Sequence, residues 1–134
     1  MTTEGEQVIR DAIDAWNARD VKRLIALHHE DAVYVNPPNA VEPGTRRGHD
    51  ELREVARKQW ESLGDTSQRV ERVHEVEGAI ISENAARRQI SGSGVPVENR
   101  ILMKWAIRDG LIERIEILGG GSEFEDARRE AGLD

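Results

Sequence analysis

Residues 97–118 read VENRILMKWAIRDGLIERIEIL. Two runs rich in β-branched and aromatic residues lie on either side of Asp109-Gly110, a dipeptide typical of tight turns between antiparallel strands. The pattern therefore predicts a β-hairpin made of strands at 97–108 and 111–118.

Two more strands are expected upstream of this hairpin, at 68–76 and 79–91, with a tight turn at Glu77-Gly78 between them. Gly92-Ser93-Gly94 separates these strands from the hairpin, and Gly119-Gly120-Gly121 ends the sheet, because glycine clusters interrupt regular structure. The second half of the chain is thus predicted to form an antiparallel sheet.

The first half of the chain is predicted to be mainly helical. Apolar residues at helical intervals predict a helix over about 4–18, and Thr3 with Glu6 has the spacing of a capping box at its start. Asp20 has the position of an N-cap for a second, short helix. A third helix is expected over 48–63, ended by the glycine that follows it.

The remaining segments complete the order of elements. Residues 32–36 predict a short strand, 37–47 a loop, and Ser122 with Glu125 a second capping box that starts a C-terminal helix. Helices that come early and antiparallel strands that come late indicate an α+β fold. We expect one domain over residues 1–134, with a cavity between the sheet and the long helices.

The composition excludes several classes of function. The chain has 134 residues and no cysteine, which rules out disulfides, thiolate metal sites and cysteine nucleophiles. Its formal net charge of −7 argues against nucleic acid as a partner. The N-terminus lacks the basic start and apolar run of a signal peptide, and no apolar stretch approaches the ~20 residues that span a bilayer. We therefore expect a cytoplasmic protein that does not enter a membrane.

Short motifs along nearly the whole chain resemble those of the SnoaL-like family, in the nuclear-transport-factor-2-like superfamily. These motifs are AWNARD at 15–20, RGHD at 47–50, GSGV at 92–95, WAIRDG at 105–110 and EAGL at 130–133. The resemblance implies a cone-shaped fold in which a curved sheet wraps around the long N-terminal helices and encloses one pocket. It implies no single reaction, because the superfamily includes isomerases, cyclases, hydrolases, dehydratases and non-catalytic binders.

The chain lacks the catalytic groups that the resemblance would require of a ketosteroid isomerase. Asn36 stands where those enzymes carry their general base, and an amide has no useful basicity. Ala12 and Met103 stand at the two positions of the oxyanion hole. We therefore do not expect steroid isomerisation.

The residues of this chain match the catalytic residues of two other reactions of the superfamily only in part. Tyr34 and Asn36 agree with two of the three water-holding residues of limonene epoxide hydrolases, but the position of the third, an aspartate, falls on Ile117. Polyketide cyclases of the family use an acidic residue in the pocket. Here Glu116 would serve only if the strand register turned it inward.

The pairing of the last two strands decides whether an acid enters the pocket. A two-residue turn would pair Met103 with Glu116, whereas a loop with a bulge at Gly110 would pair Met103 with Ile115. We expect the bulge, because it buries no unpaired charge. It gathers six apolar residues on the pocket face: Ile101, Met103, Trp105, Ile107, Ile115 and Ile117. The other face keeps four apolar residues, which predicts a homodimer packed sheet to sheet: Leu102, Ala106, Ile112 and Leu118.

Three residues are candidates for catalysis. Tyr34 and Asn36 alternate to one side of a strand, so we expect both to point into the cavity and to bind a ligand oxygen or a water. The alternative is a mutual hydrogen bond at the end of the strand. His74 is a candidate for proton transfer, with a half-exposed structural role as the alternative. His28 and His29 are expected at the end of the short helix, as partners of its dipole.

Six residues are candidates for ligand binding. Arg88 can hold a ligand carboxylate if the even-numbered residues of its strand face inward, and is otherwise a surface arginine. The others are expected to surround an apolar ligand: Trp16, Trp60, Met103, Trp105 and Ile117. No acidic or histidine set has metal-ligand spacing and no glycine run has nucleotide-binding spacing, so we expect neither metal nor cofactor.

These observations predict a protein that binds a small hydrophobic molecule. Catalysis would be of the isomerase, cyclase or hydrolase type without a cofactor. A non-catalytic binding or dimerisation module is the alternative.

Overall fold

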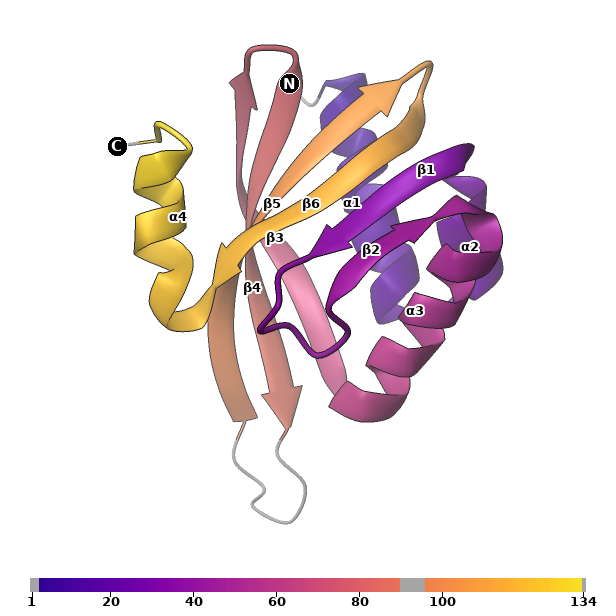
Figure 1. Cartoon of the computed structure of the whole chain (residues 1–134), viewed down its shortest axis with the longest axis horizontal. Helices are drawn as coiled ribbons and strands as arrows, with labels where there is room; N and C mark the ends of the chain where they lie inside the picture. The colour runs from indigo at the N-terminus through magenta and orange to yellow at the C-terminus, as the bar shows by residue number, and fades with distance from the viewer. Residues whose placement is uncertain (1–2, 90–95, 134) are drawn as a thin grey trace.

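A computed structural model describes residues 3–89 and 96–133 (Figure 1). It contains one six-stranded sheet in the order β2-β1-β6-β5-β4-β3. All neighbouring strands are antiparallel except β1 and β6, which are parallel. The strands are β1 (His28–Asn36), β2 (Gly44–Arg47), β3 (Thr66–Val76), β4 (Ala79–Gln89), β5 (Pro96–Arg108) and β6 (Leu111–Gly120).

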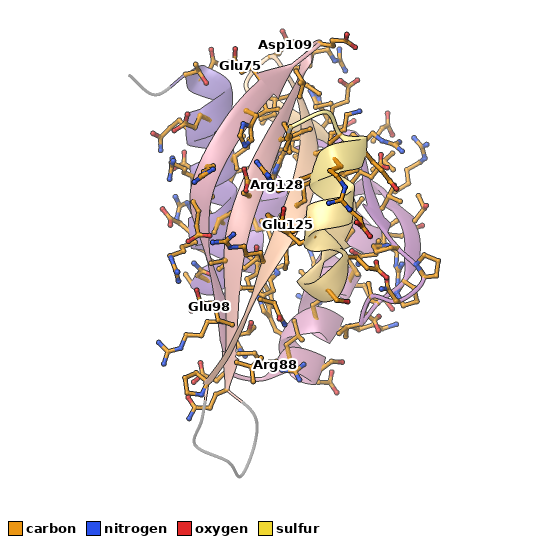
Figure 2. The ribbon with its side chains drawn as sticks, turned by 90° about the vertical axis from the view of Figure 1, so that its left-hand side faces the viewer. Glu75, Arg88, Glu98, Asp109, Glu125 and Arg128 are labelled. Atoms are coloured by element: carbon orange, nitrogen blue, oxygen red, sulfur yellow. The ribbon has the colours of Figure 1, made fainter. Side chains whose placement is uncertain are left out.

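Helices cover both faces of this curved, open sheet. The helices are α1 (Glu4–Asn17), α2 (Val21–Ala26), α3 (Gly48–Leu63) and α4 (Phe124–Glu130), the last preceded by a 3₁₀ turn at Gly121–Glu123. The first three lie against the concave face, and α4 packs on the opposite face (Figures 1 and 2). The predicted α+β cone is therefore confirmed. No helix among the described residues is long and apolar enough to cross a membrane.

The helix starts follow from local hydrogen bonds. The Thr3 hydroxyl accepts from the backbone N–H of Glu6 at 3.1 Å, and the Asp20 carboxylate accepts from that of Arg23 at 3.1 Å, as their spacing predicted. The capping box expected at Ser122 is wrong, because α4 starts two residues later without a side-chain cap. Burial of Phe124 against the outer face of the sheet sets this start instead.

Two strand predictions need correction. Residues 37–47 are not entirely loop, because β2 pairs with β1 from Val33 opposite Arg47 to Asn36 opposite Gly44. The strand β1 also begins earlier than expected, at His28, so this residue and His29 belong to a strand and not to the end of a helix. Neither segment alternates apolar and polar residues, so only pairing within the fold reveals them as strands. The glycine-serine segment predicted to separate strands at 92–94 lies outside the described residues.

The β5–β6 hairpin differs from the predicted bulge at Gly110. Arg108 pairs with Leu111 across a two-residue turn, whose residues Asp109 and Gly110 have positive φ angles of 55° and 75°. The extra residue comes later, at Glu113, and a second irregularity follows near Leu118. These shifts pair Met103 with Ile117 and Trp105 with Ile115.

Most of the apolar residues predicted for the other sheet face are covered within the chain. Leu102 and Leu118 pack against Phe124 and Ala127 of α4. Ile112, which was assigned to the same face, is buried in the main core because of the bulge at Glu113. Ala106 stays half-exposed, but α4 and the main core cover most of the apolar face on which a sheet-to-sheet homodimer was predicted.

The docking of α4 can be tested by truncating its main anchor. Phe124 is 3% exposed. Replacement Phe124→Ala should lower the free energy of unfolding by about 3–5 kcal/mol, because it removes a buried ring and leaves a cavity. Urea denaturation measures this change. The exposed Glu130→Ala on the same helix is the control and should change stability by less than about 0.5 kcal/mol. Equal stability of the two variants would show that α4 does not depend on this contact.

Candidate functional site

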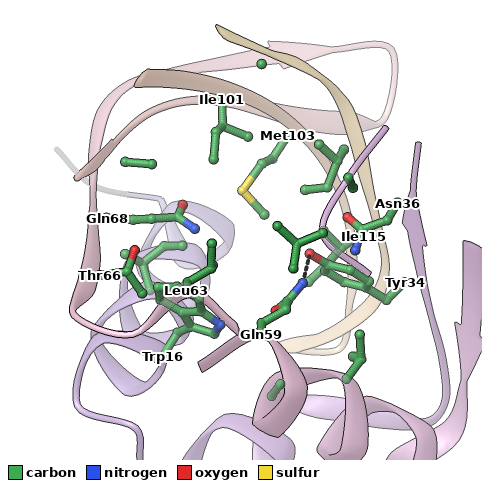
Figure 3. Close-up of a pocket in the computed structure, with 18 of the residues that line it drawn as sticks. Trp16, Tyr34, Asn36, Gln59, Leu63, Thr66, Gln68, Ile101, Met103 and Ile115 are labelled. Carbon is green, nitrogen blue, oxygen red and sulfur yellow. Dashed lines mark hydrogen bonds between the residues drawn. The ribbon is translucent and has the colours of Figure 1, made fainter. Parts of the chain in front are cut away.

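A cavity of about 470 Å³ lies between the concave face of the sheet and the helices α1 to α3 (Figure 3). This volume is typical of pockets for small organic molecules. The walls are mainly apolar and include Trp16, Leu63, Ile101, Met103, Trp105, Ile115 and Ile117.

A polar cluster of Tyr34, Asn36 and Gln59 interrupts the apolar wall. Tyr34 and Asn36 alternate along β1, so both face the cavity, and Gln59 reaches them from α3 (Figure 3). The Gln59 side-chain amide donates to the Tyr34 hydroxyl oxygen at 3.2 Å, and the Asn36 amide donates to the backbone carbonyl of Glu42 at 2.8 Å. The Tyr34 oxygen therefore accepts from Gln59, which leaves its own proton to be donated.

Tyr34 is a proton donor in this setting and not a base. Burial raises the pKa of the Tyr34 hydroxyl above its ordinary value of 10.0, although the neighbouring Gln59 and Asn36 side chains oppose the shift. The hydroxyl is therefore protonated at neutral pH. Such a group can donate a hydrogen bond to a carbonyl, hydroxyl or developing oxyanion of a ligand.

A second polar group, Gln68, lies across the cavity on β3 (Figure 3). The side chain of Asn17, at the end of α1, fixes the backbone of Gln68 with two hydrogen bonds: its amide donates to the carbonyl at 2.7 Å and its oxygen accepts from the N–H at 2.8 Å. The buried Asn84 amide donates to the Gln68 side-chain oxygen at 3.0 Å. The Gln68 amide nitrogen therefore remains available to the cavity.

His28 also lines the cavity, and it does not lie at the end of a helix as its position in the sequence predicted. Its Nδ1 lies 2.8 Å from the backbone carbonyl oxygen of Leu24, and because a carbonyl only accepts, Nδ1 carries the proton. Burial lowers the pKa of His28, the hydrogen bond to the Leu24 carbonyl opposes this shift, and the nearby His49 adds to it. The ring is therefore neutral at pH 7, and Nε2 holds a lone pair that no described protein group engages.

The sequence matches the family model of the SnoaL-like domain over residues 9–115. The chain belongs to the SnoaL-like family. No curated protein matches the sequence.

Solved structures with the same cone-shaped fold include several nuclear-transport-factor-2-like proteins. TerC, co-crystallised with polyporic acid, has a TM-score of 0.77 at 18% identity, over 95% of this chain and 99% of TerC. A nuclear-transport-factor-2-like protein of unknown function from Burkholderia pseudomallei has a TM-score of 0.75 at 18% identity, over 87% of this chain and 90% of that one. A protein with a ketosteroid-isomerase-like fold from Catenulispora acidiphila, in complex with trimethylamine, has a TM-score of 0.75 at 14% identity, over 100% of this chain and 96% of that one. At these identities the likeness shows the fold alone.

Most of the residues predicted for the site line the cavity of this SnoaL-like protein. The structure brings together Tyr34, Asn36, Trp16, Arg88, Met103, Trp105 and Ile117. Trp60 is not among the lining residues. It is buried behind Trp16, with ring centroids 6.2 Å apart, and its indole N–H donates to the Trp16 carbonyl at 3.1 Å. Trp60 therefore supports the cavity wall without facing a ligand.

His74 lies outside the cavity, where its ring contacts the Glu83 carboxylate. That carboxylate also lies 3.3 Å from the guanidinium of Arg128 on α4, so the group belongs to the outer face of the sheet. A bulge at Glu71 causes this placement, because it reverses the facing of β3 beyond Val70. The proton-transfer role predicted for His74 has no support from this position.

The cavity of this SnoaL-like protein holds no carboxylate among the described lining residues. Asn36, Ala12 and Met103 all line it, at the positions where a ketosteroid isomerase would need its base and oxyanion hole. Glu116 stays outside, where its carboxylate lies 3.7 Å from the Arg114 guanidinium. The described residues also contain no group of three His, Asp or Glu side chains placed to hold a metal ion.

The neutral state of His28 predicts a specific dependence of stability on pH. Because its folded pKa lies below the ordinary value of 6.5, the unfolded chain binds more protons there just below pH 6.5. The stability that the neutral ring contributes is present above pH 6.5 and decreases as the pH falls below it. His28→Gln should therefore flatten the dependence of the free energy of unfolding on pH between about 6.5 and 5. The matched control is His29→Gln, and identical slopes for wild type and His28→Gln would contradict this assignment.

Proposed function

We propose that this protein binds a small, mostly apolar molecule in the cavity and that the Tyr34 hydroxyl donates a hydrogen bond to an oxygen of that molecule. The observation that carries the proposal is the Tyr34 hydroxyl, which is held by Gln59 and lies among mainly apolar walls. Apolar walls supply affinity, and a few placed polar groups supply orientation. A ligand with a carbonyl or hydroxyl oxygen matches this arrangement.

Two of the similar structures support small-molecule binding by this fold. TerC was crystallised with polyporic acid and the C. acidiphila protein with trimethylamine. A homodimer and a cytoplasmic location remain predictions from the sequence.

If the protein is an enzyme, the reaction is of the isomerase, cyclase or hydrolase type without a carboxylate base. Tyr34 would polarise a ligand oxygen, and the lone pair on His28 Nε2 would accept a proton. The alternative to an enzyme is a protein that binds the same kind of molecule without converting it. The absence of an acid among the described lining residues favours this alternative.

Ligand binding can be tested by a thermal-shift screen at neutral pH against terpenoids, epoxides, steroids and aromatic polyketides. A compound at about one hundred times its Kd should stabilise the protein by roughly 2.7 kcal/mol. Tyr34→Phe should weaken a hit about threefold to tenfold, because it removes one neutral hydrogen bond. Ala86→Trp, which fills the cavity with a bulky ring, should abolish binding. A hit that both variants bind as tightly as wild type would place the ligand elsewhere and overturn the proposal.

Catalysis and binding are distinguished by the effect of Asn36→Ala. In an enzyme this variant should abolish turnover of the hit, whereas in a carrier it should only loosen binding. Product formation, followed by chromatography, and affinity, measured by calorimetry, should be compared on the same folded variant. Unchanged affinity and unchanged turnover would remove Asn36 from the site.

A further inference from the structure

Among the described residues that line the cavity, Arg88 is the only arginine, and it lies at the mouth. Arg88 lies next to the end of β4, opposite Thr66 of β3 and Val97 of β5, and all three residues line the cavity. Its side chain is exposed to solvent. Figure 2 shows Arg88 at the opposite end of the sheet from Glu75 and Asp109.

The charge of Arg88 is not neutralised within the described part of the chain. Ion pairs hold many of the other arginines, including Arg69 with Glu98 at 2.7 Å, but no described acidic side chain pairs with Arg88. The chain has 26 acidic residues and a net charge of −7, yet none of the described lining residues is acidic. The mouth therefore presents an available guanidinium beside an acid-free cavity.

We propose that the ligand is an apolar carboxylic acid whose carboxylate binds Arg88 at the mouth while its apolar body fills the cavity. This inference rests on the proposed function and names the class of molecule. A guanidinium forms two parallel hydrogen bonds with a carboxylate, which orients the ligand as well as holding it.

The interior of the cavity requires the carboxylate to stay at the mouth. Tyr34, Gln59 and Gln68 are uncharged, and His28 is neutral, so an ionised group placed among them would lose its water without gaining a counter-ion. A cationic ligand would find no described acid in the cavity and would meet the charge of Arg88 at the mouth.

The volume limits the size of the apolar body. About 470 Å³ lies in the range of pockets that take small organic molecules. The body of the acid is therefore expected to be of the size of a medium-chain fatty acid or a two-ring aromatic acid.

Isothermal calorimetry with matched pairs of probes tests the proposal. The probes are dodecanoic acid and biphenyl-4-carboxylic acid, each compared with its primary carboxamide at neutral pH. At least one acid should bind wild-type protein at least about fivefold more tightly than its carboxamide. Added salt should reduce this difference in affinity, because the ion pair between Arg88 and the ligand carboxylate is exposed to solvent. Arg88→Gln should remove the preference for the acid and leave the affinity for the carboxamide unchanged.

Matched variants separate this role from a general effect of charge. Arg87→Gln removes the adjacent arginine, which is also exposed but does not line the cavity, and should keep the preference for the acid. Arg88→Lys should keep part of it, because lysine retains the charge without the planar fork.

Three results would overturn the inference: equal binding of acid and carboxamide, a preference that survives in Arg88→Gln, or no binding of either acid. With any of them, the proposed function stands if a neutral compound binds wild type and fails to bind Ala86→Trp. If every compound that binds wild type also binds Ala86→Trp unchanged, the cavity is not the site and both proposals fail.

Discussion

Charged side chains on the last two strands must stay off the concave face of the sheet, because an ionised group without a partner is costly in an apolar interior. The strand β6 carries Glu113, Arg114 and Glu116 among its isoleucines. One extra residue at Glu113 keeps Ile115 and Ile117 opposite Trp105 and Met103, with Arg114 and Glu116 paired outside. The apolar character of the cavity depends on this local irregularity.

The polar side of the cavity depends on the same strand. Tyr34 of β1 lies in parallel register with Ile115 of β6, so a slip of one residue would turn Tyr34 away from Gln59. The opposite side of the cavity is positioned by other contacts, because the Asn17 side chain at the end of α1 forms two hydrogen bonds with the backbone of Gln68. The AWN motif therefore contributes to the site by positioning β3 as well as by placing Trp16 in the wall.

The two faces of the sheet use opposite chemistry. On the concave face, away from Arg88 at the mouth, the described polar groups that line the cavity include hydroxyls, amides and a neutral imidazole. On the outer face, the buried carboxylate of Glu83 meets both His74 and Arg128 beneath α4. A cavity whose described lining residues include no acid suits an apolar ligand. The ionic contacts on the outer face help to dock a helix that also buries Phe124.

The helices, the location of the hairpin turn at Asp109-Gly110 and the absence of catalytic acids at the family positions were predictable from the sequence, because capping, helical periodicity and turn preference act between residues close in the chain. The same holds for Tyr34 and Asn36, whose alternation along a strand needs no partner to be recognised. The register beyond the hairpin turn was not predictable, since the bulge lies at Glu113 and not at Gly110. The placement of His28, His74 and the edge strand β2 depended on the tertiary structure. Strand pairing and bulges join residues far apart in the chain, and a single extra residue at Glu71 or Glu113 exchanges the inward and outward faces of all that follows.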